Sequence, residues 1–192
     1  MNREHNVLMG LLTTDAIVMD QVRSFLSSDF GIHDLAGAPV GRIVTEGSTG
    51  SRMFMGNRQL AVVDGDNSLL LRVHDVPNLG LDRFEVHDGW GQPVAQIVKE
   101  FTLFKKSLRV ELTTGPVLRL EGSVFDREFT VTGPGGLAAT ASRSWPGVAQ
   151  AFLGRERYVL GFVPQVPVPE KLGTIGAVLA LDMIRAKERN NG

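Results

Sequence analysis

Basic and aromatic side chains stand next to each other in one short stretch of the chain. Lys105, Lys106 and Arg109 follow or flank Phe101 and Phe104. Lysine or arginine beside exposed apolar side chains is the combination by which a folded domain docks on anionic lipid, and each charge contributes about 1 kcal/mol near such a surface. We therefore expect a weak lipid-binding hairpin here. The commoner arrangement, a solvated outer face whose phenylalanines point into the core, stays open as the alternative.

Positive charge in this protein is local rather than general. The 192 residues include 20 Lys and Arg and 21 Asp and Glu, so the formal charge is −1. This balance argues against a dedicated duplex DNA binder, and we expect no nucleic-acid partner. Arg155 and Arg157 would strengthen the lipid-binding hairpin if the fold places them on the same side of the molecule.

Two His-Asp pairs, His33-Asp34 and His87-Asp88, invite a catalytic or metal-binding hypothesis. Neighbouring side chains of a strand point to opposite faces, so each His is more simply the outward neighbour of an inward apolar residue. Each Asp is then a turn former. We predict no metal site at either pair.

Enzyme motifs are also missing from the sequence. Residues 133–138 have the spacing of a dinucleotide-binding loop, but no strand-helix-strand unit surrounds them, so we interpret them as a turn. There is no GxSxG motif and no P-loop, and zero cysteines exclude thiolate metal sites, cysteine nucleophiles and disulfides. We predict no catalytic residue and no cofactor.

A repeated segment indicates how these residues are positioned. Residues 30–46 align with residues 84–100 without a gap, and ten of the seventeen positions are identical or Ile/Val exchanges. Each copy reads as strand, turn and strand, with Asp at the first turn position and Gly at the fourth, as a type I turn favours. A fainter third copy spans residues 129–141. The chain is thus a series of hairpins.

Further alternating segments, at 16–21, 60–63, 69–73, 108–112, 117–121 and 158–162, predict a sandwich or barrel. Within a helix expected at about 172–188, the segment 172–184 is apolar on every side, yet ten uncharged residues before Asp182 are too few to cross a bilayer. We predict one domain over residues 1–192: an all-β closed barrel wrapped round this helix, with a short second helix at 146–153. The residues that fill the barrel are expected to be Leu172, Ile175, Val178 and Leu179, and Asp182 should pair with Arg185 near the exit.

Several motifs in order resemble the phospholipid scramblase and LURP-one-related proteins. They are Val18-x-x-Gln21, the two Phe-x-Ile/Val-x-Asp-x-x-Gly hairpins beginning at Phe30 and Phe84, Ser142-Arg-x-Trp145-x-Gly147, Ala151-Phe152, Tyr158 and the terminal helix. The likeness covers about residues 11–188. It implies a tubby C-terminal-like fold, a barrel of about twelve strands around a hydrophobic C-terminal helix, in agreement with the periodicity.

The resemblance also implies a function. Some relatives carry an acidic calcium loop, but here residues 153–158 place one Glu between two Arg, which is a poor cage for calcium. The cysteines that carry acyl anchors are absent. With no signal peptide in the sequence, we expect a non-enzymatic, scramblase-like protein in the cytoplasm that binds anionic phospholipid peripherally at the inner membrane face. The alternative is a soluble regulatory or protein-interaction domain without lipid activity.

Overall fold

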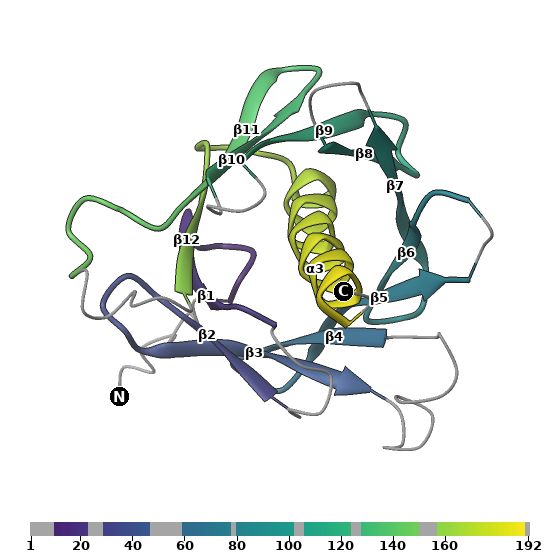
Figure 1. Cartoon of the computed structure of the whole chain (residues 1–192). Helices are drawn as coiled ribbons and strands as arrows, with labels where there is room; N and C mark the ends of the chain where they lie inside the picture. The colour runs from purple at the N-terminus through teal and green to yellow at the C-terminus, as the bar shows by residue number, and fades with distance from the viewer. Residues whose placement is uncertain are drawn as a thin grey trace.

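The computed structural model describes residues 10–22, 29–46, 59–77, 80–101, 106–123, 128–149 and 157–190. In these residues, twelve antiparallel strands form a closed barrel around one long helix (Figure 1). The elements are β1 (Ala16–Asp20), β2 (Asp29–His33), β3 (Pro39–Glu46), β4 (Gln59–Asp64), β5 (Leu69–Val76), β6 (Arg83–Asp88), β7 (Pro93–Phe101), β8 (Lys106–Leu112), β9 (Val117–Ser123), β10 (Glu128–Gly133), β11 (Gly136–Ser142), β12 (Arg157–Phe162) and α3 (Val168–Asn190).

Each strand pairs with the next strand in the sequence, and β1 closes the barrel by pairing with β12. The closing register runs from Ala16 opposite Gly161 to Asp20 opposite Arg157. Alternate residues of each strand point inward, so every second residue contributes its side chain to the core and the residues between them face outward. The prediction of an all-β closed barrel around a C-terminal helix is therefore confirmed.

The aspartates of the two aligned segments form turns, as expected. In the β2–β3 turn the Asp34 carboxylate accepts two backbone N–H bonds, and Asp88 does the same in the β6–β7 turn. Gly37 and Gly91 close these turns at φ of 92° and 82°, values that favour glycine. Residues 133–136 join β10 to β11 as a hairpin turn, which confirms the interpretation of the glycine-rich segment.

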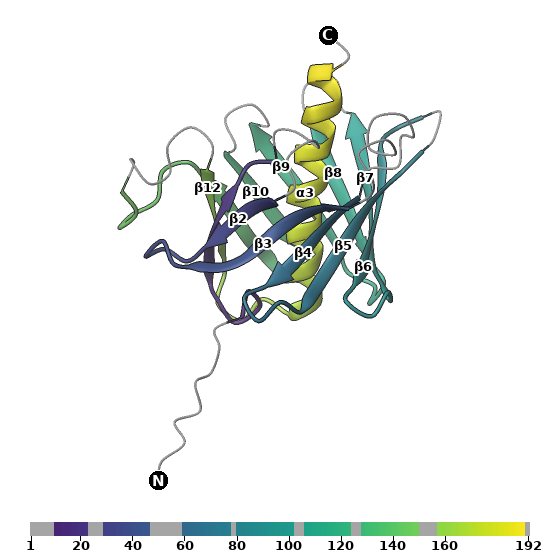
Figure 2. The same ribbon diagram turned by 90° about the horizontal axis from the view of Figure 1, so that it is seen from below.

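The helix α3 runs lengthwise through the barrel and packs mainly against β5 to β9 (Figure 2). Its Ile175, Val178 and Leu179 are buried, and Leu172 is partly buried against the same core. Two glycines permit the close approach. A Cβ on Gly173 would lie 2.6 Å from the side chain of Leu112, and one on Gly176 would lie 2.7 Å from that of Val86.

The helix is longer than the sequence predicted, Val168–Asn190 instead of 172–188. Pro169 fits the first turn, where its missing N–H has no partner to lose, and Glu170 interacts favourably with the helix dipole. The second helix, predicted at 146–153, is wrong over residues 146–149, which form a turn in which the N–H of Val148 donates to the carbonyl of Trp145. The indole of Trp145 packs on Gly161 and thereby holds this turn against the outside of the barrel. Residues 150–153 lie outside the described part of the chain.

The two ends of the barrel differ. One end, the turn end, carries the short connections 34–38, 65–68, 89–92, 113–116 and 134–135, and α3 enters there. At the other, the exit end, the C-terminal part of α3 emerges (Figure 2). No helix in the described ranges is long and apolar enough to cross a membrane.

Candidate functional site

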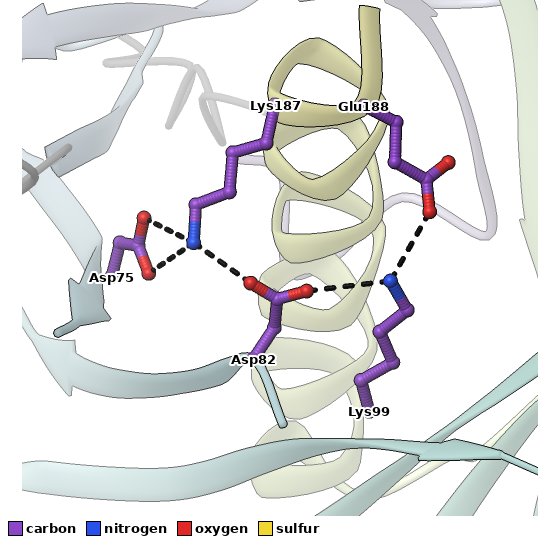
Figure 3. Close-up of polar contacts among 5 residues, drawn as sticks. All are labelled: Asp75, Asp82, Lys99, Lys187 and Glu188. Carbon is purple, nitrogen blue, oxygen red and sulfur yellow. Dashed lines mark hydrogen bonds and ion pairs between the residues drawn. The ribbon is translucent and has the colours of Figure 1, made fainter. Parts of the chain in front are cut away.

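Five charged side chains meet inside the exit end, where α3 leaves the barrel (Figure 3). The Lys187 ammonium lies 2.8 Å from a carboxylate oxygen of Asp75 and 2.8 Å from one of Asp82. The Lys99 ammonium lies 3.3 Å from the other oxygen of Asp82 and 3.1 Å from Glu188. These contacts form one chain of ion pairs, the exit-end network, that ties the last turns of α3 to β5, to the residue before β6 and to β7.

The inward alternation of the strands places these groups. On β5 the buried residues Leu71 and Val73 are followed, two positions later, by Asp75. On β7 the buried residues Ala95 and Ile97 are likewise followed by Lys99. Sequence analysis missed the network, although the signal was present: a charged residue continues the inward series of an apolar strand in both cases.

Burial makes the network electrostatically strong. The side chain of Asp75 is 2% exposed and that of Lys99 is 8% exposed. Burial works to raise the pKa of Asp82, but the hydrogen bond and charge of Lys187 and the charge of Lys99 together hold this pKa below its ordinary value. Three carboxylates against two ammonium groups leave one negative charge, so the network itself does not attract an anion.

A second buried ion pair lies one turn earlier on α3. One carboxylate oxygen of Asp182 is 3.4 Å from Arg185, which confirms the predicted pair. The other accepts the N–H of Val22 at 3.1 Å and so holds the chain after β1 over the helix. Asp182 is 1% exposed. The pair therefore anchors α3 to the first strand, opposite the network that anchors it to β5–β7.

One hollow beside the network, on the side of Lys99 and Glu188, is small. Lys99, Ser107, Leu108, Leu181, Ile184 and Glu188 are among the residues that line this hollow, which has room for about one water molecule. An acyl chain does not fit there. Together, the ion pairs and this packing fix the position of α3. We therefore assign the charged groups a structural role.

The structure places two of the predicted lipid-binding residues, Lys106 and Arg157, at the exit end of the barrel but on separate strands. Lys106 begins β8 and Arg157 begins β12, both at the exit end, with β9, β10 and β11 between them. Lys105 and Arg155 lie outside the described residues, as does the Lys106 side chain. Arg109 is 2.9 Å from Glu100 and 2.5 Å from Glu111, and Arg157 is 2.6 Å from Asp20.

His33 and His87 lie on the outer face, as expected from the burial of their neighbours Ile32 and Val86. The rings of His74 and His87 meet edge to face, with centroids 5.3 Å apart. Burial, followed by the charge of His87, lowers the pKa of His74. Among the described residues, no three His, Asp or Glu side chains are arranged to hold a metal ion.

Comparisons with known proteins agree with this architecture. A family model described as LURP-one-related matches residues 14–169. A solved X-ray structure of a protein from Arabidopsis thaliana superposes with a TM-score of 0.58 at 17% identity, covering 88% of this chain and 91% of that one. At this identity the likeness shows the fold alone. No curated protein matches the chain.

Proposed function

Because the chain belongs to the LURP-one-related family, we propose that it is a non-enzymatic, scramblase-like binding protein that docks peripherally on anionic phospholipid through the exit end of its barrel. The proposed contacts are Lys105, Lys106 and Arg155, with Arg109 and Arg157 as supporting charges. Docking of this kind leaves α3 inside the barrel.

The observation that carries the proposal is the uneven distribution of charge between the two ends. By sequence, the segments that join strands at the exit end (21–28, 47–58, 77–82, 102–105, 124–127 and 143–156) contain seven Lys or Arg and three Asp or Glu. The five connections of the turn end contain no Lys or Arg. Since anionic lipid attracts clustered positive charge within about 10 Å of its surface, the exit end is the end that would face a membrane.

The same exit-end segments also contain large apolar residues next to their basic ones. This pairing is what an interfacial contact needs, because the apolar side chains enter the headgroup region while the cations hold the lipid phosphates. The sequence neighbours are Phe25 with Arg23, Phe54 with Arg52, Phe104 with Lys105, Phe125 with Arg127 and Phe152 with Arg155.

Two of the predicted basic residues are weaker candidates than the other three. Arg109 and Arg157 already form ion pairs with carboxylates of their own sheet. Their charges are largely balanced, and a lipid phosphate would have to compete with those partners. We therefore assign the main contribution to Lys105, Lys106 and Arg155.

The proposal stops at peripheral binding. The ten uncharged residues before Asp182 span about 15 Å as a helix, half of a hydrocarbon core. Release of α3 would also break the exit-end network and expose the apolar interior of the barrel. Lipid transfer across a bilayer by a single copy is therefore no part of the proposed function.

Vesicle flotation tests the proposal. The purified protein is mixed with vesicles of neutral phosphatidylcholine, or of the same lipid with phosphatidylserine or phosphoinositide, at two salt concentrations and with or without calcium. We expect salt-sensitive, calcium-independent flotation with the anionic vesicles. Loss of three charges, in the variant Lys105→Ala/Lys106→Ala/Arg155→Ala, should weaken binding by roughly 100-fold, from about 1 kcal/mol for each charge.

A matched control removes positive charge from the outer wall of the barrel instead. Arg42 and Arg119 are exposed there, and the variant Arg42→Ala/Arg119→Ala should float like the parent protein. A loss in the control in proportion to its two removed charges would mean that only net charge matters and would contradict docking through the exit end. Absence of flotation with every vesicle would refute the lipid proposal and favour the alternative, a protein-interaction domain without lipid activity.

A further inference from the structure

A tryptophan at the turn end is almost fully exposed. Trp90 lies in the β6–β7 turn and is 88% exposed. Tryptophan is one of the most highly buried residue types on average, because its large apolar ring gains much from removal from water. Folding therefore does not explain why an indole is exposed to solvent at the tip of a hairpin, and contact with another molecule would.

The turn itself does not need this side chain. The Asp88 carboxylate accepts the N–H of Trp90 at 2.9 Å and that of Gln92 at 2.8 Å. In the β2–β3 turn the Asp34 carboxylate accepts the N–H of Ala36 at 2.9 Å and that of Ala38 at 2.8 Å. The two turns are thus the same, and alanine occupies the tryptophan's place in one of them. Trp90 is held in a fixed turn without stabilising it.

Other exposed apolar side chains lie at the same end. Among the described residues, six large hydrophobic side chains are exposed, and only Leu81 of these belongs to the exit end. The turn end carries Trp90 together with Leu35, Val117, Leu137 and Val168. Apolar side chains that are singly and partly exposed are common on folded proteins. Trp90 is by far the most exposed of the six, so it is the one that marks a binding surface at this end.

The charge of this surface indicates the chemistry of its partner. The five turns contain no Lys or Arg, whereas Asp34, Asp66 and Asp88 stand in or beside them. Hydrogen bonds from Ser68 lower the pKa of Asp66, so this carboxylate stays ionised at neutral pH. Anionic lipid would be repelled here. A cationic partner would be attracted, and its lysine or arginine could stack on the indole face.

We propose that the turn end binds a protein segment that carries basic and apolar side chains together, such as a basic amphipathic helix, with Trp90 as its central contact. A rigid, exposed aromatic residue loses little conformational freedom on binding, which favours such a role. The inference is independent of the proposed lipid contact. If the exit end rests on a membrane, the turn end faces away from it and remains free for the partner.

The test uses two dye-labelled model helices of equal length, with leucine recurring every three or four residues to form one apolar face. The other positions are lysine in one peptide and glutamate in the other, and fluorescence anisotropy is the readout. We expect salt-sensitive binding of the lysine peptide and none of the glutamate peptide. Trp90→Ala should weaken binding of the lysine peptide at least tenfold. It should leave the far-UV spectrum and the urea midpoint unchanged, because Ala36 occupies the same place in an identical turn. The control Leu81→Ala, at the opposite end, should bind like the parent.

Four outcomes would overturn the inference. Equal binding of both peptides, or undiminished binding by Trp90→Ala, would remove the basis for a cationic partner. Self-association in sedimentation experiments that Trp90→Ala abolishes would make a second copy of the chain the occupant. A Trp90-dependent blue shift of the tryptophan emission on anionic vesicles would assign the turn end to lipid. Flotation of Trp90→Ala separates the two proposals, since lipid docking through the exit end should be unaffected.

Discussion

Replacing Asp182 by alanine should destabilise the protein more than any exposed substitution. The carboxylate is buried, pairs with Arg185 and accepts the N–H of Val22. Alanine would leave a nearly buried guanidinium without this counter-charge and a buried N–H without this acceptor. The connection between α3 and the first strand would be lost at the same time.

The magnitude follows from these two losses. Removal of one partner from a buried ion pair costs about 3–5 kcal/mol, and an orphaned buried N–H by itself costs about 1–3 kcal/mol. Both losses come from the same carboxylate and do not simply add, so we take the larger one as the total. We therefore expect Asp182→Ala to lower the free energy of unfolding by about 3–5 kcal/mol. In a chain of this size that corresponds to a fall in Tm of about 6–20 °C. Asp182→Asn can still accept the Val22 N–H and should cost less, about 1–3 kcal/mol.

Urea unfolding followed by far-UV circular dichroism measures the loss, and a double-mutant cycle with Arg185→Met isolates the ion pair. The double variant Asp182→Ala/Arg185→Met should be more stable than the sum of the single losses predicts, because no unpaired buried cation remains. If Asp182→Ala lowers the free energy of unfolding by less than 1 kcal/mol, or if the two losses simply add, the buried pair is not the anchor described above.

Three further changes test other parts of the fold. Leu179→Asp places an unpaired charge in the barrel core and should prevent folding, whereas a monomeric variant with the parent spectrum would refute the buried helix. Gly176→Val should cost about 1–3 kcal/mol in urea unfolding, because its Cβ would meet a β6 side chain at 2.7 Å; the control Gly135→Ala, in open space, should be silent. The lowered pKa of His74 means that the unfolded chain binds its proton more readily. Stability should therefore fall as the pH drops below 6.5, and His74→Gln should flatten that part of the urea midpoint profile; an unchanged profile would contradict the assignment.

The barrel could be predicted almost completely from the sequence. Apolar and polar residues alternate along one segment after another, and Asp and Gly at turn positions separate these segments. The buried helix followed from its lack of a polar face. Its beginning was misplaced by four residues, since the prolines that suggested an extended lead-in are equally compatible with a first helical turn. The exit-end network could not be found by motif, because Asp75 and Lys187 are 112 residues apart and only barrel closure brings them together.

The lipid-contact residues illustrate a different limit. Adjacent basic residues predict local charge, but the cross-strand partners of Arg109 depend on register. Glu100 is its neighbour only because β7 and β8 pair as they do. Trp90 was visible in the sequence as part of a hairpin, yet its significance required the comparison of two turns in three dimensions.

The pairing of β1 with β12 has a consequence for how the protein is made. Its contacts join residues about 140 positions apart, such as Ala16 and Gly161, and the bond between Val22 and Asp182 spans 160. Contacts of such sequence separation form slowly. In addition, α3 is synthesised after all twelve strands. The apolar faces of the nascent hairpins therefore stay uncovered until α3 has been made. We therefore expect the barrel to close only after α3 has left the ribosome, and its earlier strands to depend in the cell on chaperones that shield unfinished sheets.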